Sequence, residues 1–177
     1  MALKNTEASY GWPAKVLHWS MALLIISLAA LGLYMSELPR GDAKSDLIRL
    51  HASFGLLAFM LLFVRFGWKL ANLSPEPLSK IKWQVVLSKL VHWVFYGVIA
   101  LQVVSGSLSL MTVGWDVPFF GLFEIRTTYE RDIELHHYWE DWHLVAWYSL
   151  AVLFALHLVA VLYHQFVGKK QILKRML

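Results

Sequence analysis

Histidines are the residues of this chain best suited to chemistry near neutral pH, and there are eight of them. His143 and His157 lie fourteen positions apart. On one helix, that spacing returns the second side chain to within roughly 40° of the first and separates the two by about 21 Å along the axis. One helix could therefore present two imidazoles on one face at two levels. His18 and His51 are candidates to meet them from other elements.

Bis-histidine haem ligation is the chemistry that this pattern favours. The chain has no cysteine, which excludes disulfides, iron–sulfur clusters, thiolate zinc sites and covalently attached c-type haem. Zinc or iron in a helical bundle usually recruits carboxylates or a third ligand. Residues 90–115 and 142–168 contain no acidic side chain. Two axial imidazoles and a slot for the macrocycle are enough for a b-type haem.

The elements that must position these histidines are apolar stretches. The sequence is 58% apolar and only 16% charged, against about 25% charged in soluble domains. Runs without any charged residue cover residues 16–36, 50–64, 90–115 and 142–168. The second run can continue past Arg65 and Lys69 because long basic side chains reach the membrane interface. We predict four membrane-spanning helices at about residues 14–36, 48–70, 88–112 and 140–167.

The loop charges orient these helices. One side carries eleven basic residues against Glu7 and Glu76, while the other carries five basic residues against ten acidic ones. The positive-inside rule then places both termini and the 65–89 loop in the cytoplasm. The same distribution explains the net charge of +4 without a nucleic-acid partner. We expect an all-α, integral membrane four-helix bundle that forms a single domain over residues 1–177.

Depth in the membrane sorts the histidines into an outer and an inner level. His51 and His143 fall at the outer level, and His157 falls at the inner level. His18 and His92 share this inner depth, and from the residues alone either could face His157. Small residues that could leave room for a macrocycle are Ser53, Gly55, Gly97, Ser105 and Gly106. Cations that could bind haem propionates are Arg65 at the inner level and Arg49 and Arg126 at the outer level.

Several short stretches occur in the same order as in a known family. They read VLHW at 16–19, RLHASFG at 49–55, VRFGWK at 64–69, VHWVFY at 91–96 and VSG at 104–106, followed by residues 115–123 and 143–177. Together they span nearly the whole chain. The sequence resembles the prokaryotic cytochrome b561 family of four-helix, di-haem membrane proteins.

The resemblance implies two non-covalent haem b groups in the bundle core. It implies His18 and His157 as axial ligands of the inner haem, and His51 and His143 as those of the outer haem. His92 also matches a recurrent family histidine and is expected to line the inner haem or a quinone pocket. We expect His164 and Trp19 in the same inner pocket.

The resemblance also implies electron transfer linked to the quinone pool. Some family members oxidise superoxide at the outer face and reduce ubiquinone, which would make the chain a superoxide:quinone oxidoreductase. Two positions depart from the family. His143 is followed by Leu144, where Glu is frequent, and His164 is followed by Gln165, where a second His is frequent. The outer face is net negative, so a superoxide anion would need a local basic funnel. Candidates for that funnel are Arg40, Lys44, Arg49, Arg126 and Arg131.

Two other functions fit the sequence. The chain could be a b-type haem anchor subunit that relays electrons between quinone and the iron–sulfur partner of a hydrogenase or dehydrogenase. It could instead be a colourless proton or metal transporter that uses the histidines as relay or ligands. The expected partners are the lipid bilayer, quinone, superoxide, and either a second copy of the chain or a redox partner protein.

Overall fold

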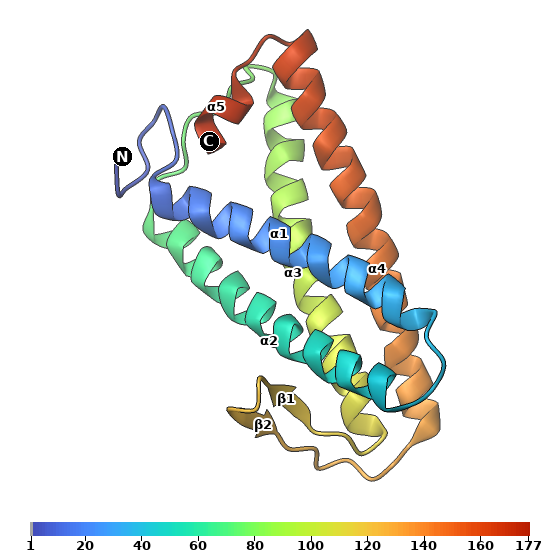
Figure 1. The fold of residues 1–177 in the computed structure, drawn as a ribbon. Helices are drawn as coiled ribbons and strands as arrows, with labels where there is room; N and C mark the ends of the chain where they lie inside the picture. Colours follow the sequence, from blue (N-terminus) through green and yellow to red (C-terminus); the bar gives the residue numbers. More distant parts are fainter. Residues whose placement is uncertain (1) are drawn as a thin grey trace.

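Four long helices dominate the fold (Figure 1). A computed structural model describes residues 2–177. The helices are α1 (Trp12–Ser36), α2 (Asp42–Ala71), α3 (Lys82–Thr112) and α4 (Ile133–Leu162), and a π-helical turn, η1 (Tyr163–Val167), continues α4. All four are long and apolar enough to cross a membrane. Each of the four predicted spans thus falls on a helix that could cross a membrane, as expected where lipid leaves the backbone no partner outside its own segment.

Three of these helices begin earlier than the apolar runs suggest. The first turns of α2, α3 and α4 are polar, so composition alone assigns them to loops. At α4 the side chain of Asp132 caps the helix, because its Oδ1 accepts the Leu135 N–H at 2.9 Å. Glu134 adds a negative charge to the same first turn. Both features stabilise a helix N-terminus in water.

A β-hairpin interrupts the loop between α3 and α4, which is the loop predicted to lie at the outer face. Strand β1 (Val117–Phe119) pairs antiparallel with β2 (Phe123–Ile125). The turn places Phe120 at φ 51° and Gly121 at φ 73°, the two positive φ values that a type I′ turn requires. The sequence indicates only a long aromatic loop here, because the Asn-Gly or Asp-Gly signal of such turns is missing. The all-α expectation is therefore correct for the spans and incomplete for the loop.

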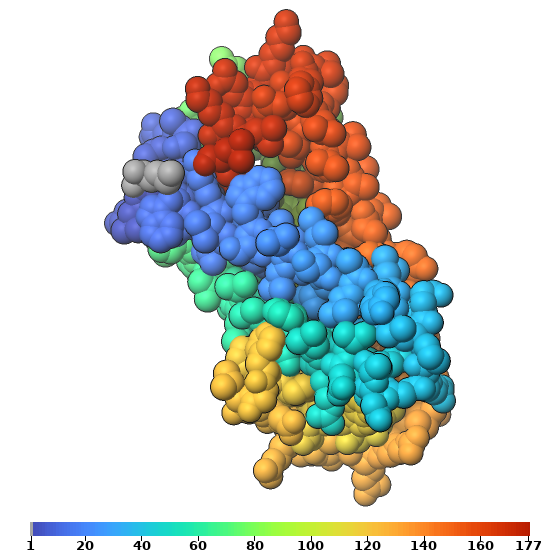
Figure 2. Space-filling view, viewed as in Figure 1, coloured from blue at the N-terminus to red at the C-terminus, as the bar shows by residue number. Residues whose placement is uncertain are grey.

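The helices pack as two antiparallel pairs. The most extensive contacts join α3 to α4 and α1 to α2, and contacts between α2 and α3 connect the pairs. Helix α4 has no comparable contact with α1 or α2. The space-filling view shows a hollow between α1 and the C-terminal half of α4, with α3 visible behind it (Figure 2). We call the space between α4 and the α1–α2 pair the opening.

All four helices meet at a single apolar cluster. Met21, Leu62, Ile99 and Leu150 are buried there, one side chain from each helix. Leu150 lies halfway between His143 and His157 along α4, seven residues from each. We call these four residues the waist. It separates the two histidine levels.

The chain ends are held together at one end of the bundle. A short C-terminal helix, α5 (Ile172–Met176), carries Arg175. The Arg175 guanidinium donates hydrogen bonds to the carbonyls of Glu7 at 3.1 Å, Ala8 at 2.7 Å and Glu76 at 2.7 Å. Both termini and the α2–α3 loop therefore share one end, while the hairpin lies at the other (Figure 1).

This shared end makes the topology testable. A reporter fused after Leu177 and one inserted within residues 74–77 should both read cytoplasmic, because this end has the excess of basic residues. A reporter inserted at Gly121, in the hairpin turn, should read periplasmic and serves as the control. Green fluorescent protein and alkaline phosphatase fusions would measure the three positions. A periplasmic signal at either of the first two sites would overturn the inner and outer assignments.

Candidate functional site

The predicted outer pair meets across the opening. His51 of α2 and His143 of α4 have ring centroids 6.4 Å apart and ring planes inclined by 73°. A metal ion bound between two imidazole nitrogens at about 2.0–2.1 Å places the ring centroids roughly 6–6.5 Å apart. The spacing of these two rings therefore fits an iron atom between them. The two helices that carry them do not pack closely on each other.

A backbone hydrogen bond fixes the orientation of His143. Its Nδ1 donates to the carbonyl of Gln102 on α3 at 2.8 Å. The neutral ring then keeps its lone pair on Nε2, the atom available for a metal. The Gln102 side-chain amide lies 3.0 Å from that Nε2 and donates to it. A carbonyl behind a ligating histidine is the usual arrangement at metal sites, because it sets both tautomer and ring direction.

A glycine gives the His143 ring its room, and another borders the His51 ring. A Cβ on Gly106 of α3 would lie 2.8 Å from both Cε1 and Nδ1 of His143. A Cβ on Gly32 of α1 would lie 3.5 Å from Cε1 of His51. The Nδ1 of His51 is buried and has no hydrogen-bond partner within residues 2–177. The outer level thus combines a close-fitting His143 ring, a buried His51 nitrogen without a partner within residues 2–177, and a His143 Nε2 that could bind iron once the Gln102 amide turns away. These features fit a haem.

The inner level gathers three histidines. The His157 ring of α4 lies 6.4 Å from the His92 ring of α3 and 5.7 Å from the Phe95 ring. His92 donates its Nδ1–H to the Ser88 carbonyl at 2.6 Å, which frees its Nε2. His157 and His92 are both titratable neighbours of His18 on α1. His92 thus contacts His157 directly and His18 lies in the same region, so the choice of the second inner ligand stays open, as it does from the sequence.

Arg65 favours a different neutral tautomer in His18 from the one that His143 adopts. Its guanidinium Nη2 donates to Nδ1 of His18 at 2.9 Å. A neutral His18 with that nitrogen occupied carries its proton on Nε2. Ligation through Nε2 requires the other tautomer, so Arg65 must first turn away. A haem propionate is a carboxylate of the kind that guanidinium binds well, so one movement could free His18 and satisfy Arg65.

The two outer arginines differ in their surroundings. Arg49 lies 3.9 Å from a carboxylate oxygen of Glu124 and stacks 5.6 Å from the Trp115 ring centroid. The Arg49 charge is thus already paired with a carboxylate of the hairpin. Arg126 is exposed and has no ion-pair partner within the described part of the chain. Lys44 donates to the carbonyls of Ser36 and Leu38, at 3.3 and 2.9 Å, and so closes the α1–α2 turn.

The residues expected near a quinone are held by the C-terminal segment. Trp19 donates its indole N–H to the Met176 carbonyl at 2.8 Å. His164 lies in η1, and π-helical turns occur often at functional sites. Gln165, the departure from the family pattern, accepts the Leu173 N–H at 3.2 Å and so anchors the start of α5. No direct contact joins His92, His164 and Trp19 within residues 2–177, so their quinone role stays a prediction.

Of the other predicted slot residues, Ser53 has a hydrogen-bonding role, whereas Gly55 and Gly97 border open space and stay a prediction. The Ser53 hydroxyl lies 3.0 Å from the Pro118 carbonyl, to which it donates, and accepts the Phe120 N–H at 3.1 Å, so it docks the hairpin onto α2. A Cβ on Gly55 or Gly97 would meet no atom within 4 Å. Sequence reasoning missed Gln102 and Gly32. A glutamine in the middle of an apolar span is a usable signal for the first, and nothing marks the second.

Comparison with known proteins gives one consistent result. The family model described as prokaryotic cytochrome b561 matches residues 9–177. Cytochrome b561 homolog 2 of Escherichia coli strain K12 is 30% identical over 185 aligned positions, covering all of this chain and 95% of that protein. Such membership indicates a multi-pass membrane protein that binds b-type haem and transfers electrons. With both comparisons spanning essentially the full length, the chain belongs to the prokaryotic cytochrome b561 family.

Proposed function

We propose that this chain carries electrons across the bacterial inner membrane between a donor at the outer face and quinone, with both termini in the cytoplasm. It would hold two haem b groups, which supply reversible one-electron chemistry when bound. The observation that carries the proposal is the His51–His143 pair: two imidazoles from separate helices, 6.4 Å apart across the opening. The Gln102 carbonyl behind His143 supports a ligating role.

For the inner level we propose His157 and His18 as the axial pair, with His92 beside them. The support is the opening itself. α1 and α4 leave a hollow between them (Figure 2), whereas α3 and α4 pack tightly along their length. A flat macrocycle needs such a gap, as the outer pair also has between α2 and α4. Arg65 is the proposed propionate partner here, since it already reaches the His18 ring.

Superoxide is the donor we propose, and quinone the acceptor. The support for an anion at a net-negative face is local: Arg126 is exposed beyond β2 and keeps its charge unpaired within residues 2–177. Ubiquinone would bind at the inner level, where His164 and His92 place polar atoms next to lipid-facing apolar surface. Trp19 would join them on releasing its hydrogen bond to the Met176 carbonyl. Such groups can hydrogen-bond a quinone carbonyl and assist proton uptake from the cytoplasm.

One observation favours a second function, that of an anchor subunit for an iron–sulfur partner. The hairpin exposes apolar side chains at the outer face, with Leu122 78% and Phe123 46% exposed. Exposed apolar groups on a water-facing loop are common at docking surfaces. In this function a soluble protein, not superoxide, would be the electron-exchange partner at the outer level.

The haem content tests the proposed ligands. The parent protein should hold two haems per chain in a pyridine haemochromogen assay. His143→Ala should leave one haem, because a six-coordinate haem needs both imidazoles. His18→Ala should also leave one, while His92→Ala should keep two. Two haems in His18→Ala and one in His92→Ala would instead assign the inner ligand to His92. A single haem in the parent protein would refute the proposal of two haem levels.

Gly106 provides a test of the outer level that leaves every ligand in place. Gly106→Ala puts a methyl group 2.8 Å from an imidazole held by its hydrogen bond to Gln102. Overpacking of this kind costs about 1–3 kcal/mol, so outer haem should be lost in dialysis at least about threefold faster. Gly97→Ala is the matched control on the same helix, because no atom lies within 4 Å of the added carbon. Equal haem retention in both variants would argue against the outer site.

Salt and charge reversal test the donor. Stopped-flow absorbance should show reduction by superoxide slowing as salt rises, since screening limits electrostatic attraction to about 10 Å at 0.1 M. Arg126→Glu should slow reduction by roughly threefold or more at low salt, while Arg126→Lys should not. Rates indifferent to both would exclude the basic funnel. No reduction by superoxide, with fast reduction by an iron–sulfur protein, would favour the anchor function.

A further inference from the structure

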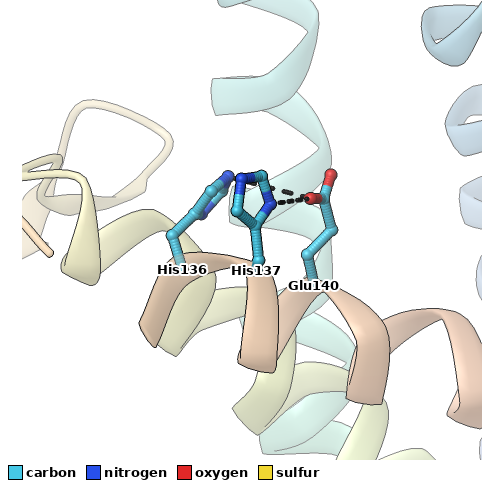
Figure 3. A group of neighbouring side chains, drawn as sticks. All are labelled: His136, His137 and Glu140. Atoms are coloured by element: carbon cyan, nitrogen blue, oxygen red, sulfur yellow. Dashed lines mark hydrogen bonds and ion pairs between the residues drawn. The ribbon is translucent and has the colours of Figure 1, made fainter. Parts of the chain in front are cut away.

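Three potential metal ligands gather at the start of α4, outside the two histidine levels. His136, His137 and Glu140 point their ligating atoms toward one another on the same side of the helix (Figure 3). One atom from each residue lies within 4.8 Å of the other two. The proposed function uses none of the three. We propose that they bind a divalent transition-metal ion of the Zn²⁺ type at the outer face.

The distances suit such an ion. Nδ1 of His137 lies 3.3 Å from Oε2 of Glu140, and Nε2 of His136 lies 3.9 Å from the same oxygen. Ligands placed tetrahedrally at about 2.0–2.2 Å from zinc are roughly 3.3–3.6 Å from one another. Small rotations of two side chains would close the remaining difference, and those of His137 and Glu140 are 65% and 62% exposed.

His136 is already oriented as a ligand. Its Nδ1 donates to the Ser109 carbonyl of α3 at 2.9 Å, which leaves the lone pair on the Nε2 that faces Glu140. This repeats the arrangement of His143 on Gln102. The two histidines are seven residues apart on α4, and the two carbonyls are seven residues apart on α3. Such a fixed tautomer is what the second shell of a metal site provides.

The donor set identifies the class of ion. Two imidazoles and one carboxylate suit Zn²⁺ and related transition metals, whereas Mg²⁺ and Ca²⁺ require oxygen ligands throughout. Three protein ligands leave a fourth position for water. Because α4 rises about 10.5 Å over seven residues, the ion would lie two turns beyond His143. It would add positive charge to an outer face whose loops are net negative.

Competition with a coloured zinc chelator tests the site on the purified holoprotein in detergent, with an affinity tag free of histidine. The parent should take up one Zn²⁺ per chain that excess Mg²⁺ does not displace. Glu140→Gln and His137→Ala should each weaken Zn²⁺ binding at least about tenfold, as loss of a ligand does. Both side chains are exposed, so the variants should retain full haem content.

Glu134→Gln is the matched control, because Glu134 is an acidic residue of the same helix outside the cluster. It should bind Zn²⁺ as the parent does. Two results would overturn the proposal. One is parent-like binding by Glu140→Gln, and the other is equal weakening in Glu140→Gln and Glu134→Gln, which would mean that only the general negative charge attracts the ion.

Discussion

The hydrogen bonds from imidazole Nδ1 groups on α4 to backbone carbonyls on α3 set the geometry on which both proposed sites depend. His143 to Gln102 and His136 to Ser109 are two examples with one register. A carbonyl inside a helix has a second lone pair, so each bond adds to the helix ladder without breaking it. Because both hydrogen bonds share one register, a shift of α4 along α3 by one helical turn would break both of them together. The register of the two helices therefore fixes the tautomers of both His143 and His136, the latter in the proposed metal site.

The pairing of helices explains how a bundle of apolar spans can leave room for cofactors. Helices in lipid gain little from hiding leucine, so contacts form where small residues permit close approach. Gly106 and Ser105 do this on α3, where the Ser105 hydroxyl turns back to the Leu101 carbonyl at 2.6 Å. The α3–α4 pair is dense as a result, and the opening on its other side stays wide. The proposed ligands therefore come from helices that contact each other only weakly outside the waist.

Much of this arrangement can be predicted from the sequence, because two simple physical rules determine where the helices run and how deep each residue lies. Lipid forces the spans to be helical, and the rise per residue fixes the depth of every histidine, so the His51–His143 level follows from counting. The direction in which a side chain points around its axis depends on packing, which counting does not give. That is why the choice between His18 and His92 as the second inner ligand stays open. It is also why the contact of Gln102 with His143 was not predicted. The hairpin depends on positive φ at Phe120, a residue that gives no such signal.

The waist has a consequence for energy conversion. The side chains of Met21, Leu62, Ile99 and Leu150 offer no hydroxyl, amide or charge between the two levels, and Tyr96 alone among the residues packed against them carries a hydroxyl. A chain of water molecules therefore finds few groups to bind there. Electrons tunnel through such material, whereas protons need hydrogen-bonded carriers. With the two proposed haems bound on either side of it, the waist would let electrons pass and hinder protons. If electrons move inward and protons are taken from the cytoplasm, each turnover would leave the cytoplasm more negative and charge the membrane.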